Sequence, residues 1–223
     1  KSFTIGKDGN SNVVDLEPGH TYYYHEFAAP SNGNYTLDNN WYKFTASQIA
    51  SHTDANNPLI LKTSDTPYVY LRIHKTGTEA AGSTAGAEYE IWYDGKGGAD
   101  GGKGTGLKFT IGNDEYSNVV KVEPGHTYYY HEFGTPSNGS YLLDDTRYKV
   151  TADQIKDHTS NSNPLVVNTS DTPKTYVYLT KASSNTDVTH NNRCYSLKDG
   201  IFELANTKTG KTYTVTTDEN GNT

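Results

Sequence analysis

Cysteine, long apolar runs and clustered basic residues are scarce in this sequence, and each scarcity excludes a class of protein. Cys194 is the only cysteine among 223 residues, which excludes an internal disulfide framework and a zinc site built from cysteines. No apolar run approaches the roughly 20 residues of a membrane span, and no signal-peptide pattern opens the chain. The net charge is −7 and Lys and Arg form no cluster. We therefore expect no nucleic-acid partner and no membrane partner.

Methionine is missing altogether, even at the first position, which indicates a segment of a longer protein. The chain is also poor in Leu and Ala, whereas it has 19 Tyr and 21 Gly and many Thr, Ser, Asn and Asp residues. This composition suits strands and turns rather than helices, so the predicted class is all-β. The simplest interpretation of Cys194 is a half-buried small residue.

An internal repeat organises the chain. Residues 3–66 and 109–172 are identical at 42 of 64 positions, counted directly. A third and fainter copy begins after the second. The sequence therefore predicts one whole unit, 68–173, and two fragments, 1–67 and 174–223.

Strand and turn patterns fill each unit. Some segments alternate apolar and polar residues, and others are rich in β-branched and aromatic residues. These segments predict strands within 87–93, 108–112, 123–133, 163–169 and 175–181. The glycine-rich stretch 94–106 predicts a long hairpin loop, because it lacks the GKS or GKT ending and the following helix of a phosphate-binding loop. Thr-x-x-Gln capping patterns predict one short helical turn in 45–52 and another in 151–158. Repeat units of this kind point to a β-sandwich.

The phrase GHTYYYHEF occurs at 19–27 and again at 125–133. Side chains alternate along a strand, so the carboxylate of Glu132 is expected on the same face as Tyr128 and Tyr130. The two rings would give this carboxylate apolar walls.

Other chemistry-bearing patterns have simpler explanations. His20 with His25, and His126 with His131, are five residues apart, which puts the two rings of each pair on opposite faces of a strand. The Asp/Asn-rich stretch 8–12 lacks the bidentate Glu of a calcium loop and reads as a hairpin turn. No Ser/His/Asp arrangement or pair of carboxylates repeats. We therefore expect no metal, no cofactor and no enzyme acting on outside substrates.

The stretch PGHTYYYHEFGTPSNGSY (124–141) resembles the signature G-x-Y-x-x-x-E-x-x-A-P-x-G-Y of Cna B-type, prealbumin-like domains, which form the stalks of Gram-positive surface adhesins and pilins. Residues 69–95 and 177–223 resemble the opening strands of these domains, V-x-L-x-K followed by G-A-x-F-x-L. Residues 166–173 stand where such domains end. The resemblance extends over essentially the whole chain.

This resemblance implies tandem immunoglobulin-like or prealbumin-like β-sandwich repeats. Residues 68–173 would form a complete B-type domain, 1–67 a domain lacking its first strands, and 174–223 the first strands of a further domain. The implied function is a structural stalk or pilus-shaft segment, extracellular and attached to the cell wall of a Gram-positive bacterium or assembled in a filament. The implied partners are neighbouring repeats or copies of the same protein, head to tail. A host or glycan ligand would bind through regions outside this sequence.

The resemblance also implies a self-directed reaction in the middle unit. Lys75 on the first strand would attack the carboxamide of Asn168 on the last strand, Glu132 would mediate the proton transfers, and ammonia would leave. Burial favours a neutral amine and a protonated acid, which this reaction requires.

The flanking copies depart from that pattern. Glu26 is kept in the first copy, but Lys62 replaces the Asn, so no such bond is expected there. Lys181 matches the nucleophile in the third copy, whereas its partners would lie beyond the sequence. Both fragments would expose unpaired strand edges. Continuation in a longer array is favoured over completion by a neighbouring copy, because segments 3–12 and 213–223 overlap and a donor would bring one strand too many.

A carbohydrate-binding module is the alternative function, since exposed aromatic rings stack on sugars. The candidates are Tyr23, Trp41, Trp92 and Tyr129. Arg147 replaces Trp41 in the other copy, which weakens a shared platform for a sugar.

Overall fold

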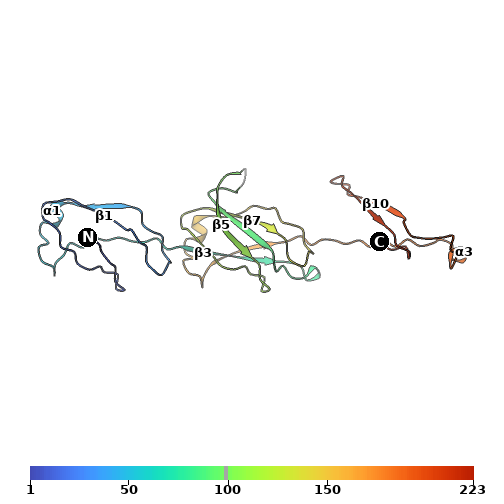
Figure 1. Ribbon diagram of the computed structural model, residues 1–223, viewed down its shortest axis with the longest axis horizontal. Coiled ribbons are helices and arrows are strands. Elements are labelled where there is room, and N and C mark those ends of the chain that lie inside the picture. The colour runs from blue at the N-terminus through green and yellow to red at the C-terminus, as the bar shows by residue number, and fades with distance from the viewer. Residues whose placement is uncertain (98–99) are drawn as a thin grey trace. The chain divides into compact units, whose positions relative to one another are not determined.

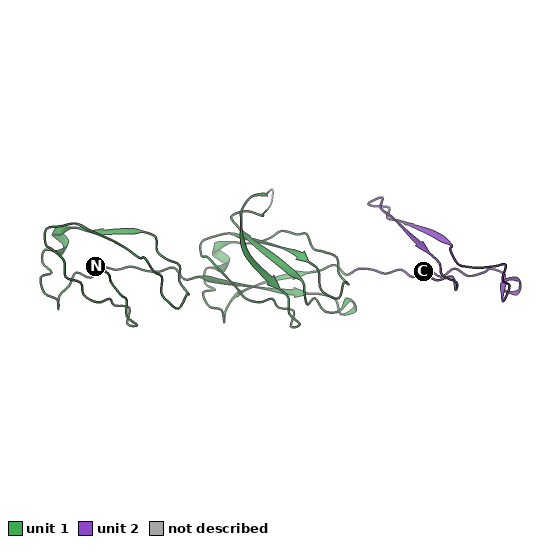
Figure 2. Ribbon diagram, in the orientation of Figure 1, with its two compact units in different colours: residues 1–173 green, residues 174–223 purple. Residues whose placement is uncertain are grey.

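The computed structural model describes residues 1–97 and 100–223, and the chain divides into two compact units, 1–173 and 174–223 (Figures 1 and 2). The elements of the first unit are β1 (Tyr22–His25), β2 (Trp41–Phe44), α1 (Ala46–Ile49), β3 (Val69–Thr76), η1 (Glu79–Ala81), β4 (Glu88–Tyr93), β5 (Lys103–Thr110), β6 (Val120–Val122), β7 (Tyr128–Gly134), β8 (Tyr148–Val150), α2 (Ala152–Ile155) and β9 (Leu165–Ser170). The second unit contains α3 (Thr186–Thr189), β10 (Ile201–Ala205) and β11 (Thr212–Thr216). In the ranges that the structure describes, no helix is long and apolar enough to cross a membrane.

Two sheets form the centre of the first unit. One has the strand order β6-β3-β9, with β3 antiparallel to β6 and parallel to β9. The other has the order β5-β4-β7-β8 and is antiparallel throughout. Strands β3, β5 and β7 can be followed in Figure 1. The sheet order separates β3 from β4, its next strand in sequence, so the chain crosses from one sheet to the other between them.

A single apolar cluster lies between these sheets. Alternate residues of β3 supply one side, namely Val69, Leu71 and Ile73, each at most 1% exposed. Strands β4 and β5 supply the other side, including the buried Tyr89 and Phe109. Because both sheets bury one face in the same core, the chain has the predicted all-β sandwich fold.

Residues 1–67 repeat half of this architecture. Their β1-β2 pair corresponds to the β7-β8 pair, and the rings of Tyr24 and Tyr42 stack with centroids 5.3 Å apart. The matching rings of Tyr130 and Tyr148 stack at 5.2 Å. The predicted helical turns are confirmed as α1 and α2, each with a capping box. Gln48 and Gln154 close these boxes from the third helical position.

Two of the predicted segments differ in the structure. The glycine-rich loop is shorter than 94–106, because β5 begins at Lys103 and pairs with β4 across a bulge; residues 98–99 of that loop lie outside the described residues. The strand predicted at 175–181 does not form a ladder, and its Thr180 makes only an isolated bridge to Asn222. Such a strand needs neighbours, and the second unit contains no counterpart of β6 or β9 in its described residues.

The second unit is a β10-β11 hairpin with α3. Its large apolar side chains are mostly on the surface, as with Tyr176 and Val177, each 77% exposed. Cys194 is exposed rather than half-buried. The division of the chain into one complete domain and two partial domains stays a prediction.

Candidate functional site

The site begins with a lysine that is fully buried. Lys75 is 0% exposed because β3 alternates and places it on the core face, two residues after Ile73. Its Nζ atom lies 3.1 Å from Glu132 Oε1 and 2.5 Å from Asp171 Oδ1. Lysine is almost never fully buried unless it is paired. Here it lies between two carboxyl groups that are also buried.

Glu132 reaches the amine from β7 in the opposite sheet. Its carboxyl group faces the core together with Tyr128 and Tyr130, as the alternation predicted. The backbone N–H of Asp144 donates a hydrogen bond of 2.8 Å to Glu132 Oε2. With Oε2 held in this way, Oε1 lies 3.1 Å from Lys75 Nζ, an ion-pair contact without the geometry of a hydrogen bond.

Asp171 approaches from the other side, directly after β9. Its backbone N–H lies 3.4 Å from the carbonyl oxygen of Thr76, which continues the contact between β9 and β3. Its Oδ1 atom accepts a hydrogen bond from Lys75, whereas its buried Oδ2 atom has no hydrogen-bond partner among the described residues. An unpaired buried carboxyl oxygen is costly.

Two hydroxyl groups complete the surroundings of the amine. The Tyr89 hydroxyl accepts a hydrogen bond of 2.6 Å from Lys75 Nζ and lies 3.0 Å from Thr169 Oγ1. Burial raises the pKa of Tyr89, so this phenol stays neutral. It therefore orients the amine without adding another negative charge.

Burial shifts the carboxyl groups toward their protonated forms. It raises the pKa of Glu132, against the opposing effects of the Asp144 N–H and of Lys75. It likewise raises the pKa of Asp171, against the hydrogen bond from Lys75. One ammonium group between two carboxylates would leave a buried excess of negative charge, which favours moving a proton onto a carboxylate. A proton taken from Lys75 would leave a neutral amine beside a carboxylic acid.

The structure does not bring the predicted acceptor Asn168 to this amine. In the parallel pairing of β3 with β9, Lys75 lies opposite Thr169 and His74 lies opposite Asn168. Asn168 is exposed, and its Oδ1 lies 3.1 Å from His74 Nδ1 on the outer face. Asp171, which faces the core as Thr169 does, holds the position expected for Asn168.

A signal in the repeat pointed to Asp171. The segment Thr-Ser-Asp-Thr-Pro occurs at 63–67 and at 169–173, so Asp65 matches Asp171. The first copy has Lys62 where the second has Asn168, so the repeat keeps the aspartate in both copies but not the asparagine. Comparing the two copies position by position would have favoured the aspartate.

No protein-family model matches the chain, and no curated protein matches it by sequence. Among solved structures, the chain is similar to the Bacillus anthracis TIE protein, with 17% identity and a TM-score of 0.39 over 99% of this chain and 36% of the other. It is also similar to the major pilin subunit of Bacillus cereus, with 18% identity and a TM-score of 0.33 over 47% of this chain and 28% of the other. A streptococcal ancillary pilin matches with 14% identity and a TM-score of 0.38 over 93% of this chain and 62% of the other. The chain thus spans less than two thirds of each of these proteins.

The candidate residues of the first and third copies are not gathered into a site like the one around Lys75. Glu26 is half-buried and Lys62 is exposed, both in residues 1–67. Lys181 is exposed in the second unit. In the described residues, none of these three side chains forms an ion pair.

The aromatic residues considered for sugar stacking do not form one platform. Tyr23 and Trp41 are 65% and 66% exposed on the β1-β2 pair. Trp92 is half-buried, and Gly97 passes so close that a Cβ atom there would lie 2.6 Å from the Trp92 ring. Tyr129 is half-buried, with the Lys149 ammonium 6.0 Å from its ring centre.

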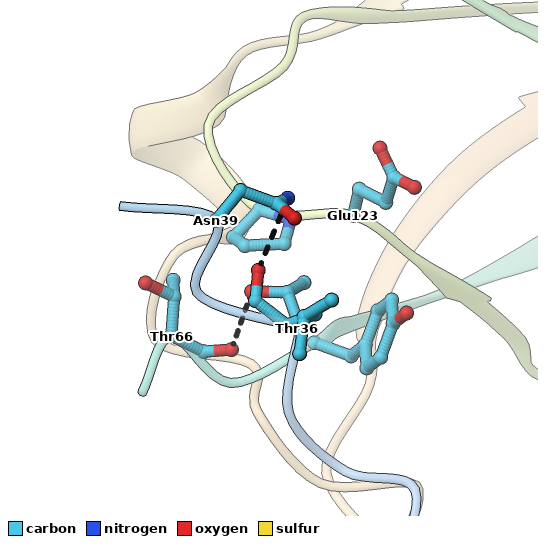
Figure 3. A pocket seen from close by; sticks show the side chains of 7 residues that line it. Thr36, Asn39, Thr66 and Glu123 are labelled. Carbon is cyan, nitrogen blue, oxygen red and sulfur yellow. Dashed lines mark hydrogen bonds between the residues drawn. The ribbon is translucent and has the colours of Figure 1, made fainter. Parts of the chain in front are cut away.

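A separate pocket of about 490 Å³ lies in the first unit, where residues 36–39 and 66–68 meet residues 123–124 (Figure 3). The Thr36 hydroxyl donates a hydrogen bond of 3.2 Å to the Thr66 carbonyl oxygen. Among its lining residues, Glu123 supplies one carboxylate and Tyr68 one phenol, and the others carry no ionisable group. The pocket therefore offers no cluster of groups that would take part in chemistry.

Proposed function

We propose that this chain is a structural segment of a stalk or pilus shaft, in which residues 68–173 are cross-linked by an amide bond between Lys75 and Asp171. The observation that carries the proposal is the fully buried Lys75 amine, held within 3.1 Å of Glu132 and 2.5 Å of Asp171. Two of the similar solved structures are pilins, which agrees with an extracellular structural role on a Gram-positive cell.

The reaction needs only groups already in the site. Lys75 gives a proton to Glu132, and the neutral Nζ attacks Cγ of Asp171. The C–N bond forms, the C–Oδ2 bond breaks, and the oxygen leaves as water with the proton returned by Glu132 and a second proton from Nζ. An ammonium and a carboxylate thus become an amide and water. The product removes two charges from the core, which relieves their desolvation cost.

The bond would connect the first and last strands of the domain. It would close a covalent loop from residue 75 to residue 171, which restricts the unfolded chain. If the loop-closure reasoning for disulfides applies, the bond stabilises the domain by roughly 4 to 5 kcal/mol. Pulling force would also pass from β3 to β9 without loading the intervening strands.

Intact-protein mass spectrometry tests the bond directly. The full chain is expected to weigh one water less than its sequence, whereas Lys75→Arg, Glu132→Ala and Asp171→Ala should have the full sequence mass. Asp171→Asn should lose one ammonia instead. Asn168→Ala is the matched control and should keep the loss of water. Recovery of residues 75 and 171 in separate peptides from an unreduced mass would disprove the bond.

Glycan binding is not favoured by the geometry. Trp92 is covered by its own loop, and the exposed Tyr23 and Trp41 belong to a copy whose counterpart has Arg147 in place of the Trp. Scattered exposed aromatic residues are common on protein surfaces and are not by themselves a sugar site.

A further inference from the structure

A short segment before β8 holds the proton carrier of the proposed reaction. The backbone N–H of Asp144 donates a hydrogen bond of 2.8 Å to Glu132 Oε2, so that oxygen is already occupied. The other oxygen, Oε1, is buried, lies 3.1 Å from Lys75 Nζ and has no hydrogen-bond partner among the described residues. A proton that leaves the amine therefore reaches Oε1 and not Oε2.

The side chain of Asp144 is fixed by its own segment. The backbone N–H of Thr146 donates to Asp144 Oδ1 at 3.0 Å, and the hydroxyl group of Tyr148 donates to Asp144 Oδ2 at 2.6 Å. Tyr148 is in turn held in β8, where its ring stacks on that of Tyr130 with centroids 5.2 Å apart. The N–H that reaches Glu132 thus belongs to a residue whose two carboxylate oxygens are both bonded.

The same bonds recur in residues 1–67. The Asp38 N–H donates to Glu26 Oε2 at 2.7 Å. The Asn40 N–H and the Tyr42 hydroxyl donate to the two carboxylate oxygens of Asp38, at 3.0 and 2.6 Å. The three positions between the aspartate and the tyrosine all differ between the copies, Asn-Asn-Trp in the first against Asp-Thr-Arg in the second. The arrangement therefore depends on the aspartate and the tyrosine.

Asp144 stays ionised in this place. Burial by itself would raise the pKa of Asp144, but the hydrogen bonds from Thr146 and Tyr148 lower it below its ordinary value. Asp144 thus differs from Glu132 and Asp171, because burial raises the pKa of both. The site has one carboxyl group that is held charged beside two that take up protons readily.

Asp144 acts in opposite directions on these two carboxyl groups. Burial raises the pKa of Glu132, and the hydrogen bond from the Asp144 N–H opposes this effect. Burial raises the pKa of Asp171 as well, against its bond with Lys75, and the negative charge of Asp144 raises it further. A hydrogen bond to a carboxylate favours its charged form, whereas a nearby negative charge favours the protonated form. Asp144 thus weakens Glu132 as a base and strengthens Asp171.

We infer that Asp144 is a positioning residue of the cross-linking reaction and directs the proton through the site. Its backbone N–H leaves Glu132 Oε1 to take the proton from Lys75. Its negative charge then favours the transfer of that proton to Asp171 Oδ2, the oxygen that leaves as water. This inference rests on the proposed function, because it needs the reaction between Lys75 and Asp171.

The proton path balances in atoms and in charge. The ammonium group of Lys75 loses one proton to Glu132 Oε1, and the neutral Nζ attacks Cγ of Asp171. Glu132 then gives this proton to Asp171 Oδ2, Nζ supplies the second proton, and the C–Oδ2 bond breaks to release water. Asp144 gains and loses no proton in these steps, so it can be replaced without removing a reactant.

The groups around Asp171 come from several elements. Lys75 lies on β3, Glu132 on β7 and Tyr89 on β4, whereas Asp144 precedes β8. Lys75 and Glu132 take part in the reaction, and the phenol of Tyr89 stays neutral because burial raises its pKa. Asp144 is therefore the charge that can be removed while the reacting groups stay in place.

The rate of water loss as a function of pH tests the inference. The full chain is purified in urea before it has folded, diluted into buffers from about pH 5 to about pH 10, and quenched with acid at increasing times for intact mass. Asp144→Asn keeps the backbone N–H and can still bond Thr146 and Tyr148, but it has no charge. A site without this charge releases its protons more readily, so the high-pH limb of the rate should move down by about one pH unit. Asp145→Asn, which removes the exposed charge next to it, is the matched control and should have the wild-type profile.

Tyr148→Phe separates position from charge. This variant keeps the ring that stacks on Tyr130 and the charge of Asp144, but it loses one of the bonds that fix the aspartate. The rate should fall about 10-fold at every pH, with the high-pH limb where the wild type has it. Asp144→Ala should show both effects, a lower rate and a displaced limb.

The outcomes separate this inference from the proposed function. A wild-type chain that loses one water, with an unchanged pH profile for Asp144→Asn or an unchanged rate for Tyr148→Phe, would overturn the inference and leave the cross-link standing. Equal slowing of Asp144→Asn and Asp145→Asn at every pH would also overturn it, because the loss would then be one of folding. A wild-type chain that keeps its full sequence mass at every pH would overturn the proposed function, and this inference with it.

Discussion

At the scale of single residues, the protein buries one ammonium group and two carboxyl groups, those of Lys75, Glu132 and Asp171, against a largely apolar core. Replacing such a cluster with apolar residues often stabilises a protein, so stability by itself does not explain its presence. The proposed covalent reaction would explain it, because Lys75, Glu132 and Asp171 would supply the amine, the proton carrier and the acceptor. Tyr89 then has the role of a positioning residue, through its bond of 2.6 Å to the amine.

Tyr89→Phe is expected to slow the reaction without abolishing it, because the variant keeps the ring but loses the hydroxyl that accepts from Lys75. Positioning effects of this kind change rates by about 10- to 100-fold. The measurement is the fraction of chains that have lost one water at increasing times after a short pulse of expression. Tyr129→Phe, on the outer face of the same sheet, should match the wild type. Equal rates for Tyr89→Phe and the wild type would contradict the positioning role.

The pH dependence of stability should report the burial of Asp171 in a chain that cannot react. In Glu132→Gln the lysine and the aspartate remain, and burial raises the pKa of Asp171 above its unfolded value. A raised pKa means that the folded state binds the proton more tightly, so the contribution of Asp171 is greatest at low pH and falls as pH rises through the folded pKa.

The comparison is between Glu132→Gln and the double variant Glu132→Gln/Asp171→Ala. Urea unfolding from about pH 4 to about pH 7 should show that the single variant loses stability relative to the double variant as pH rises. The opposite trend would mean that pairing with Lys75 outweighs burial and lowers the pKa of Asp171 in the folded state.

The sequence singled out Lys75 and Glu132 through the resemblance to Cna B-type domains, and strand alternation placed Glu132 on the face of Tyr128 and Tyr130. The structure brings Lys75 Nζ within 3.1 Å of Glu132 Oε1. The structure places Asn168, the predicted acceptor, opposite His74 and not Lys75, because which face of β9 meets the lysine depends on the parallel register between β3 and β9. That register is a contact between residues far apart in the chain, and one position of shift turns every side chain to the other face.

At the scale of elements, the same short sequence forms a strand in one part of the chain and no ladder in another, depending on the segments that pair with it. VYL occurs at 69–71 in β3 and at 177–179 in the second unit. The first is a central strand with partners on both sides, whereas the second forms no ladder. Local propensity therefore predicted both strands, but only pairing and burial decide which one forms.

Matched phenylalanines in the two copies offer a test of this difference. Phe109 in β5 is 0% exposed and its counterpart Phe3 is 40% exposed. Phe109→Ala should destabilise the middle unit by about 3 to 5 kcal/mol because it leaves a cavity, whereas Phe3→Ala should cost below about 1 kcal/mol. Thermal or denaturant unfolding of dilute protein measures both. Comparable losses would contradict the difference in burial between the two phenylalanines.

At the scale of the whole molecule, the repeat places one hairpin turn at three positions along the chain. Gly6, Gly112 and Asp218 each donate to a carbonyl oxygen four residues later, at 2.7, 2.8 and 2.7 Å. The second turn belongs to the part of the chain that contains the buried core, whereas the first and third turns belong to residues 1–67 and 174–223, whose apolar side chains are largely exposed.

Hydrogen exchange should reveal that division along the chain. Amides of β3, the central strand of the order β6-β3-β9, should exchange slowest, because it is paired on both sides and buried, while amides of β1, β10 and β11 should exchange fast. The measurement is the exchange rate of each amide in the intact chain. Equal rates in β3 and in β10 would contradict the division, because burial of the core would then give β3 no extra protection.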